Sequence, residues 1–254
     1  PTAPAVTVLD ATCTVRDGKL TVKQSGKPVL TTAEEDTILY RAGTDNDTDP
    51  FFSYTMKPYL AQNGRVIRTE KIANGFKVVS EVANKKAKFE VIDTYEGVAC
   101  GILVTSRIHC VSGGGILPRF GKTFRLDSVF DAVEYTGRTG ETYIDMRDQF
   151  PIGKVSCKVT DMTEPNIKPQ ESGNRMDCTV ASVSDGKTCV VFEAVGRPFE
   201  LGIKPYTDRA LLSMKHRRDE ARTGTYVTIQ AFQQGIGTGA CGPGVMPEFK
   251  YHLK

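Results

Sequence analysis

The sequence predicts an all-β protein built as an antiparallel sandwich, with one short helix at an edge. Many short segments alternate apolar and polar residues with a period of two, which is typical of half-buried strands. Glycine, asparagine and aspartate turn signals separate these segments, and one stretch alone has convincing helical spacing. A single all-β domain can be this long, so we expect one domain over residues 1–254. No fixed repeat is visible, which disfavours a propeller.

The composition of the chain is that of a globular protein and disfavours several kinds of partner and site. Hydrophobic residues make up 39% of the chain, enough for a core, and the net charge of +3 is too small to favour nucleic acid or a membrane as partner. No apolar run is long enough to cross a bilayer. The seven cysteines form no C-x-x-C pair, so we expect no zinc site, no cofactor, reduced thiols and a cytoplasmic location.

The N-terminal region predicts a meander of short strands. Two hairpin turns, Asp17-Gly18 and Ser25-Gly26, separate the apolar runs. The expected strands are Val6–Leu9, Cys13–Arg16 and Leu20–Lys23.

A dense polar segment, Arg41–Asp47, follows the short apolar run Ile38–Tyr40. The carboxylate and amide groups of Asp45, Asn46 and Asp47 can bind a cation or cap backbone amides in a turn. The glycine and ligand spacing of an EF-hand is missing, so calcium is disfavoured and no metal site is assigned.

The expected helix opens at Asp49-Pro50, where aspartate can cap the first amides and proline suits the first turn. An apolar stripe with helical spacing continues to Leu60, and Asn63-Gly64 provides a stop. Pro58 should kink or shorten the helix. We expect it to cover one edge of a sheet.

The alternation returns from Arg65, with reversals at Asn74-Gly75 and Asn84–Lys86. Val98–Val111 is expected to be one long strand, and its His109 a packed strand residue because no partner acid lies nearby in sequence. Further strands are expected at Thr123–Leu126, Val155–Val159, Cys178–Ser182, Cys189–Phe192, Phe199–Ile203, Tyr226–Phe232 and Val245–Tyr251, with a glycine-rich crossing at 134–145 and a helical turn at 210–216.

Pro169–Arg175 contains an acid, two amides, a guanidinium and a glycine within seven residues. It cannot be a core strand, because almost nothing in it can be buried unpaired. Glu171 and Arg175 can form a charge-assisted pair, and Gln170 and Asn174 can each donate and accept hydrogen bonds. The segment is either a loop that recognises hydroxyl groups or a hydrogen-bonded corner between strands. Most loops only connect elements, which favours the corner.

The last loop, Gly235–Pro243, has four glycines in nine residues. Cys241 is the one cysteine expected to face solvent. A nucleophilic thiol needs a lowered pKa and an adjacent base, and the sequence indicates neither.

Several of these segments occur together in an order that resembles a known family. They are Arg41–Asp47, Leu117–Gly121, Gly137–Asp145, Pro169–Arg175, Pro205-Tyr206, His216 and Gly235–Pro243. The chain is similar to the C-terminal domain of family 2 glycoside hydrolases of the β-galactosidase type, also found as the small chain of two-subunit β-galactosidases. The resemblance implies a large antiparallel supersandwich related to galactose mutarotase.

The same resemblance implies a non-catalytic role in the hydrolysis of terminal β-D-galactosides. In the family this domain packs against a catalytic (β/α)₈ barrel, on the same chain or as a separate subunit, and lends a loop to the rim of the galactoside site. Catalytic residues are therefore expected to be absent here. The expected rim residues are Gly239, Cys241 and Gly242, and the expected loop or interface residues are Arg41, Asp45, Asn46, Asp47, Glu171, Asn174, Arg175 and His216. No tryptophan is available to stack on the sugar.

Three other functions stay open. A mutarotase-like aldose epimerase would need a general acid and base, for which His109 or His216 with Glu171 are the candidates. A stand-alone carbohydrate-binding module would need aromatic platforms, and tryptophan is absent. A purely structural domain would support assembly without touching sugar.

Overall fold

The computed structural model describes residues 5–8, 11–47, 62–237 and 245–253, and in this part of the chain the fold is an all-β sandwich. Every pairing between described strands is antiparallel, as the sequence predicts. The largest sheet has eight strands in the order β1 (Ala5–Val8), β2 (Ala11–Arg16), β3 (Lys19–Gln24), β4 (Lys27–Ile38), β10 (Arg119–Leu126), β17 (Thr225–Gln233), β16 (Phe199–Lys204) and β13 (Arg175–Cys178).

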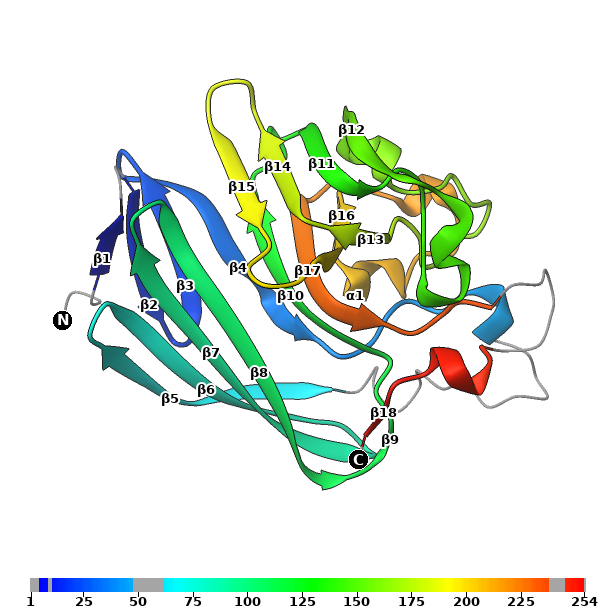
Figure 1. Cartoon of the computed structure of the whole chain (residues 1–254), viewed down its shortest axis with the longest axis horizontal. Coiled ribbons are helices and arrows are strands. Elements are labelled where there is room, and N and C mark those ends of the chain that lie inside the picture. Colours follow the sequence, from blue (N-terminus) through cyan, green and yellow to red (C-terminus); the bar gives the residue numbers. More distant parts are fainter. Residues whose placement is uncertain (1–4, 9–10, 48–61, 238–244, 254) are drawn as a thin grey trace.

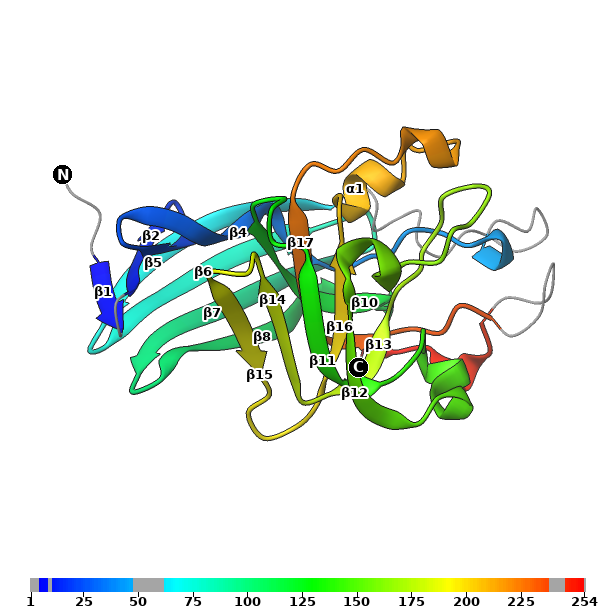
Figure 2. The same ribbon diagram turned by 90° about the horizontal axis from the view of Figure 1, so that it is seen from above.

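Two four-stranded sheets pack against different parts of this large sheet, as Figures 1 and 2 show. The first has the order β5 (Asn63–Ile72), β6 (Gly75–Ala83), β7 (Ala87–Val98) and β8 (Gly101–Gly113). The second has the order β12 (Ile152–Lys158), β11 (Ala132–Arg138), β14 (Val180–Ser184) and β15 (Cys189–Glu193). A short pair, β9 (Gly115–Ile116) with β18 (His252–Leu253), closes the C-terminal end.

Helical structure is confined to short turns in the described residues. The helix α1 (Asp208–Leu211) is capped by Thr207, whose hydroxyl accepts a hydrogen bond from the Ala210 amide. This agrees with a single helical turn, although it begins earlier than the expected 210–216. The 3₁₀ turns are η1 (Asp45–Asp47), η2 (Ile144–Gln149), η3 (Val159–Met162), η4 (Arg217–Asp219) and η5 (Pro247–Phe249). No helix in the described part has the length and hydropathy needed to span a membrane.

The hydrophobic core joins all three large sheets. Its members include Phe124 of β10, Phe76 of β6 and Val133 of β11, all at most 5% exposed. Since successive side chains of a strand point to opposite faces, the remaining residues of β10, β16 and β17 form a second, polar face. In β16, Leu201 and Ile203 join the core, while Glu200 and Lys204 lie on the polar face and are nevertheless buried. Loops cover this polar face, and the candidate functional site lies between the loops and the sheet.

The predicted hairpins of the N-terminal meander are confirmed. Asp17 and Gly18 have φ of 49° and 76°, and Ser25 and Gly26 have φ of 49° and 79°. A two-residue type I′ hairpin turn requires positive φ at both of its central residues. Gly18 also lies so close to Val66 of β5 that a β-carbon there would overlap its side chain. The turn therefore also forms a contact between sheets.

Several expected elements differ from the structure. Val98–Val111 is not one strand, because β7 ends at Val98 and β8 begins at Gly101 after a tight turn. His109 lies on β8 but is exposed rather than packed. Cys178–Ser182 is divided between β13 and β14, the 134–145 crossing contains most of β11, and Val245–Tyr251 contains the turn η5 instead of a strand. The expected helix from Asp49 to Leu60 lies outside the described residues, and Asn63 already opens β5.

The twelve-residue strand β4 was not predicted. Its stretch Thr31–Thr37 contains one alanine and six polar residues, so it shows no alternation of apolar and polar side chains. Its pairing with β10 is irregular: Thr37 lies opposite Lys122 and Thr32 opposite Phe124, so β4 advances five residues while β10 advances two. Such a bulge redirects side chains out of the regular alternation. Here it turns Glu35 and Asp36 toward a pocket described below.

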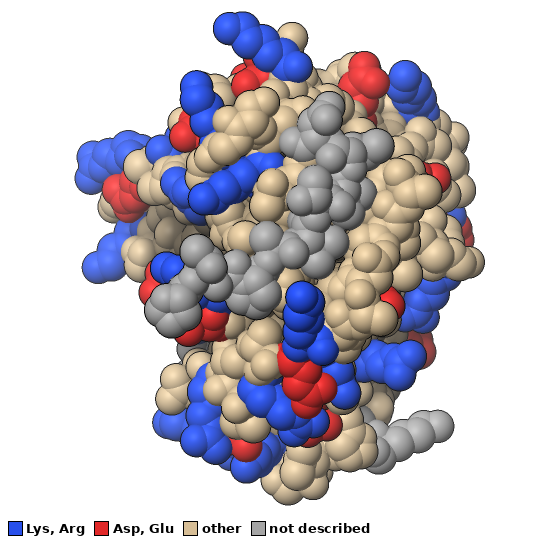
Figure 3. All heavy atoms as spheres, turned by 90° about the vertical axis from the view of Figure 1, so that its left-hand side faces the viewer, with Lys and Arg blue, Asp and Glu red and all other residues tan. Residues whose placement is uncertain are grey.

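Surface charge and cysteines complete the description. On the face shown in Figure 3, basic and acidic side chains are interspersed rather than separated into single-sign areas. The six described cysteines are free thiols, with Cys13 and Cys178 buried and Cys100 and Cys189 exposed.

Candidate functional site

The candidate site surrounds the stem of the last glycine-rich loop, Gly235–Gly237, which follows β17. Three consecutive stem residues are each held by a side chain from elsewhere in the chain. Arg41 Nη2 donates to the Gly235 carbonyl over 3.0 Å, and Asn46 Nδ2 donates to the Ile236 carbonyl over 3.2 Å. The Gly237 amide donates to Asp145 Oδ2 over 2.7 Å. The start of the loop is therefore fixed in direction by the body of the domain.

Glycine is required at both ends of this stem. A β-carbon at Gly235 would overlap the Asp145 carboxylate. Gly237 has φ of 87°, in the left-handed region that favours glycine, and a β-carbon there would lie 2.8 Å from Asn46 Nδ2. The close approach of the Asp145 and Asn46 side chains thus depends on the glycines that the sequence places here.

The Arg41–Asp47 ion pair is the centre of the stem contacts. Arg41 is 0% exposed, and its Nη1 and Nη2 lie 2.5 Å and 3.0 Å from the two Asp47 carboxylate oxygens. Asp47 also accepts hydrogen bonds from the amide and the hydroxyl of Thr44. Burial opposes the charge of Arg41, but Asp47 outweighs it and the pKa of Arg41 is raised. The guanidinium stays charged, and the Asp47 oxygens are fully engaged.

This arrangement leaves few oxygen atoms free to bind a cation at residues 45–47. Asp45 is exposed, with Lys168 Nζ 3.9 Å from its carboxylate. Its backbone amide donates a hydrogen bond to Gln170 Oε1. Among the described residues, no group of three or more acidic, cysteine or histidine side chains is placed to hold a metal. The turn-capping alternative describes this segment.

Glu171 connects the segment 169–175 to a cluster of buried charges. Its carboxylate lies 3.0 Å and 3.2 Å from Lys204 Nζ and accepts the Ala42 amide over 3.1 Å. Lys204 also lies 2.6 Å from Asp208, which in turn lies 3.0 Å from Arg119. Each of these four side chains is at most 6% exposed. Two anions and two cations balance, as buried charges require.

The electrostatics of Asp208 follow from this balance. Burial alone would raise the pKa of this carboxyl, but Arg119 and Lys204 together lower it to about 2. The same carboxylates raise the pKa of Lys204 although burial opposes its charge. Asp208 and Lys204 are thus held ionised, together with Arg119, whose pKa the Asp208 carboxylate raises although burial opposes its charge.

A chain of amide hydrogen bonds extends the cluster across the polar face of β10, β17 and β16. Arg119 Nε donates to Gln230 Oε1 over 2.6 Å, and Gln230 Nε2 donates to Asn174 Oδ1 over 2.8 Å. Asn174 Nδ2 then donates to Glu200 Oε2 over 2.8 Å and to the Thr142 carbonyl over 2.8 Å. Asn174 therefore joins the strands to the segment before η2.

Glu200 is the buried carboxyl without a cationic partner in this chain of contacts. Burial raises its pKa to about 7, although hydrogen bonds from Asn174 and from the Gln233 backbone act in the opposite direction. Native Glu200 thus keeps its proton to about pH 7, while an ordinary glutamic acid loses it near 4.5. In that window the native state binds more protons than the unfolded state, so the free energy of unfolding falls as pH rises.

We expect Glu200→Gln to remove this pH dependence. Between pH 4.5 and pH 8 the variant should gain roughly 3 kcal/mol relative to wild type, because glutamine resembles the protonated acid. Urea unfolding at several pH values measures the difference. Glu193→Gln, at the exposed end of β15, is the matched control and should follow wild type. A constant difference between Glu200→Gln and wild type across the pH range would contradict the assignment.

The structure corrects the prediction for 169–175 in one respect. Glu171 and Arg175 do not pair: Arg175 Nε donates to the Tyr135 hydroxyl over 3.1 Å, and Glu171 binds Lys204. Gly173 has φ of 87°, and its amide donates to Glu141 Oε2 over 3.0 Å. The segment is a hydrogen-bonded corner, buried almost throughout.

The histidines are not brought to this cluster. His216 is exposed at the start of η4, where its backbone amide donates to Asp219, and His109 is exposed on β8. Neither makes a hydrogen bond to Glu171 in the described part of the chain, so the acid–base pair that an epimerase would need is not formed there. The predicted rim residues Gly239, Cys241 and Gly242 lie outside the described residues.

Sequence reasoning missed the part of the network that lies on strands β10, β16 and β17 and on the short helical turns η2 and α1. The missed residues are Arg119, Asp145, Glu200, Lys204, Asp208 and Gln230. A signal was present: β16 reads Phe-Glu-Leu-Gly-Ile-Lys, an alternation that predicts a half-buried strand and gives no sign that its polar side chains are buried. Only the loops laid over that face bury them.

Comparison with known proteins gives a consistent result. The family described as "Beta galactosidase small chain" matches residues 9–254. The chain is 26% identical over 221 residues to a β-galactosidase of Staphylococcus xylosus, covering 81% of this chain and 21% of that protein. It is 27% identical over 244 residues to a β-galactosidase of Lactobacillus delbrueckii subsp. bulgaricus, covering 92% and 24%.

A third relative, a β-galactosidase of Lactococcus lactis subsp. lactis, is 30% identical over 134 residues, which cover 52% of this chain and 13% of that protein. The chain thus spans about a fifth to a quarter of the length of the first two relatives. The family match extends over nearly the whole chain, including every residue of the network around the glycine-rich stem. This chain belongs to the β-galactosidase small chain family.

Proposed function

We propose that this chain is the non-catalytic C-terminal domain, or small chain, of a family 2 glycoside hydrolase that cleaves terminal β-D-galactosides. The family match and the similarity to β-galactosidases support this role. The small share of each relative that the chain spans supports a larger catalytic part beside it. That part is a (β/α)₈ barrel, carried on the same chain or as a separate subunit.

The observation that carries the proposal is the clamped stem of the glycine-rich loop. Arg41, Asn46 and Asp145 hold three consecutive residues of the stem, and Arg41 is itself fixed by a buried ion pair. Side chains held in this way can position a loop to within the tolerance that a sugar site needs. The loop, with Gly239, Cys241 and Gly242, would form one rim of the galactoside site next to the barrel.

The buried carboxylates support a structural rather than a catalytic role for this chain. Glycoside cleavage needs two carboxyl groups on either side of the scissile bond, roughly 5–10 Å apart, with one poised to give a proton. Asp47, Glu171 and Asp208 are instead each paired with a buried cation, and Glu200, which keeps its proton to about pH 7, is bound to Asn174 within the same hydrogen-bond network. The nucleophile and the acid/base group would therefore belong to the barrel.

The interface with the barrel would be formed by residues around the stem, with exposed Asp45 and His216 as further candidates. Glu171, Asn174 and Arg175 would hold the underlying loops in place. The free thiols of the described cysteines support a reducing, cytoplasmic compartment for the assembled enzyme.

Hydrolysis of 2-nitrophenyl β-D-galactopyranoside tests the proposal. Three samples are compared: this chain, the large part of its enzyme without this region, and the two together. We expect no turnover by this chain alone and turnover that rises on mixing until the two are equimolar. Heat-unfolded chain is the control. Turnover by the pure chain, or a large part that is fully active without it, would overturn the proposal.

A further inference from the structure

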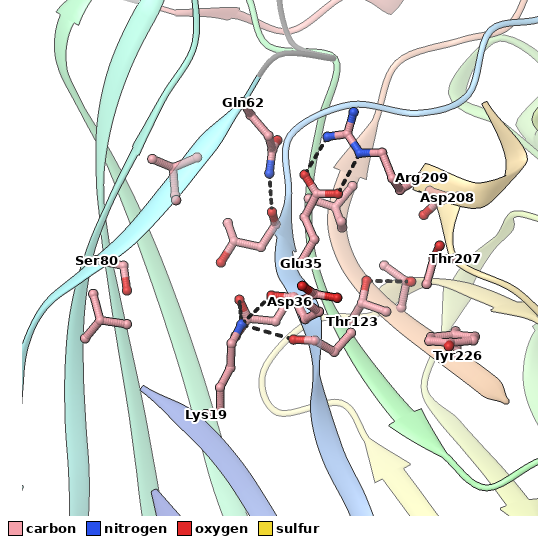
Figure 4. A pocket seen from close by; sticks show the side chains of 18 of the residues that line it. Lys19, Glu35, Asp36, Gln62, Ser80, Thr123, Thr207, Asp208, Arg209 and Tyr226 are labelled. Atoms are coloured by element: carbon pink, nitrogen blue, oxygen red, sulfur yellow. Dashed lines mark hydrogen bonds and ion pairs between the residues drawn. The ribbon is translucent and has the colours of Figure 1, made fainter. Parts of the chain in front are cut away.

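A pocket of about 600 Å³ borders β4 of the large sheet, away from the glycine-rich stem. Strands β4, β5 and β6 form its walls, and β10 and β17 with the residues leading into α1 form its floor. Figure 4 shows Ser80 on one side of β4 and Thr123, Thr207 and Tyr226 on the other. It shares Lys204 and Asp208 with the charge cluster but no residue with Gly235–Gly237. Its volume falls in the range of roughly 300–1,000 Å³ that is typical of small-molecule sites.

Hydroxyl groups dominate the floor. The Oγ1 atoms of Thr123 and Thr228 lie 2.9 Å apart across the β10–β17 pair, and the Tyr226 hydroxyl lies 3.2 Å from that of Thr223. Thr123, Thr228 and Tyr226 are at most 9% exposed. A hydroxyl that makes one hydrogen bond keeps capacity for more, because it offers one donor and two acceptor positions. The floor can therefore donate to and accept from a ligand that is rich in hydroxyl groups.

Most of the charged side chains around the pocket are already paired, and Asp17 and Glu34 lie at its exposed edge. Asp36 lies 3.2 Å from Lys19 and 2.8 Å from Lys122, and Glu35 lies 2.8 Å from Arg209. Lys204 and Asp208 are paired as described above. A ligand with a net charge would have to compete with these pairs, whereas a neutral polar ligand can use their remaining donor and acceptor positions. The pocket therefore favours an uncharged ligand.

Apolar groups are placed between these polar ones. Val66 and Val82 line the β5–β6 wall, Ile38 lines the β4 side, and the Tyr226 ring lies on the floor. A sugar has the same mixed character, with C–H groups on its faces and hydroxyl groups around its edge. Aromatic and aliphatic side chains pack on those faces while polar groups fix orientation.

We propose that this pocket is a binding site for a neutral mono- or disaccharide. It accounts for the unusual polar sequence of β4, whose bulge carries Glu35 and Asp36 to the pocket. The site is distinct from the rim formed by the glycine-rich loop, and its argument does not depend on the proposed role in galactoside hydrolysis.

The paired threonines offer a clean test. Thr123→Val/Thr228→Val removes both partners of one hydrogen bond, so neither hydroxyl is left unsatisfied and the fold should be retained. Thr94 and Thr105, opposite each other on β7 and β8, form a matched pair outside the pocket. Galactose, glucose and lactose are titrated against each full chain and followed by ligand-observed NMR, with galacturonate and galactosamine as charged analogues.

We expect saturable binding of at least one neutral sugar to wild type, weakened roughly tenfold in Thr123→Val/Thr228→Val and unchanged in Thr94→Val/Thr105→Val. The charged analogues should bind more weakly than galactose. Ser80→Leu, on the β6 wall of the pocket, should block binding by filling part of the pocket. It serves as the test if the threonine variant fails to fold.

Two results would overturn the proposal. One is the absence of saturable binding of any of the three neutral sugars to folded wild type. The other is binding that survives both the threonine substitutions and Ser80→Leu, or that favours a charged analogue. None of these outcomes bears on the hydrolysis assay, so the two proposals can fail separately.

Discussion

Lys204→Met is expected to lower the free energy of unfolding by about 3–5 kcal/mol. Lys204 Nζ is the shared partner of Glu171 and Asp208, and its removal leaves two carboxylates buried with Arg119 as their remaining close cation. An uncompensated charge in a site with at most 6% exposure is the costly case, in contrast to loss of a whole ion pair. Urea unfolding at pH 7 measures the loss.

Lys154→Met is the matched control, because Lys154 pairs with Glu134 on the surface, where the two side chains are 71% and 55% exposed. It should cost under about 1 kcal/mol. Adding Glu171→Gln to Lys204→Met restores the charge balance, so the double variant should lose less than the sum of the single losses. Equal losses in the surface and buried variants, or strict additivity, would show that the cluster does not act as a unit.

Arg41→Met is expected to cost a similar amount, about 3–5 kcal/mol, and also to release the loop stem. The change leaves the Asp47 carboxylate buried without its cation and removes the donor to the Gly235 carbonyl. Arg41→Lys should be intermediate, because an ammonium group cannot reproduce the two-pronged contact.

Amide hydrogen exchange separates these two effects of Arg41→Met. Protection of the Gly235 and Gly237 amides, which donate to Phe249 and Asp145, should fall in Arg41→Met more than global destabilisation explains. Lys204→Met, with similar stability, should keep relative protection at the stem. Arg68→Met, in an exposed pair with Glu70, is the surface control. Unchanged stem protection in Arg41→Met would remove Arg41 from its positioning role.

The strands and hairpins were largely predictable because their determinants are local. Asp17-Gly18 and Ser25-Gly26 are turn residues that need no tertiary partner to favour a reversal, whereas the turn expected at Asn74-Gly75 lies one position earlier, at Ala73-Asn74. Errors arose where the local pattern was broken by tertiary context. The bulged and polar β4 gave no alternation to detect, and the β7–β8 turn lacks an Asn-Gly or Asp-Gly signal at Ala99-Cys100.

The candidate site was predictable only in part, for a related reason. The sequence identified its loop residues Arg41, Asp47, Glu171 and Asn174 as unusual, because charged and amide groups were crowded there. It did not identify their partners, since pairing was sought within the segment. Glu171 lies four positions from Arg175 but binds Lys204, 33 positions away, and only the folded sheet brings those two together.

The separation along the chain of the residues that clamp the stem also constrains how the domain matures. Arg41 and Gly235 are 194 positions apart, and Ala42 and Glu171 are 129 positions apart. Contacts of such long range form late, because the loop they close must first lose much of its conformational freedom. During synthesis, Arg41 therefore remains without its Gly235 partner until the chain beyond β17 has left the ribosome. The stem therefore reaches its native position only when both the segment around Arg41 and the segment around Gly235 are present and folded.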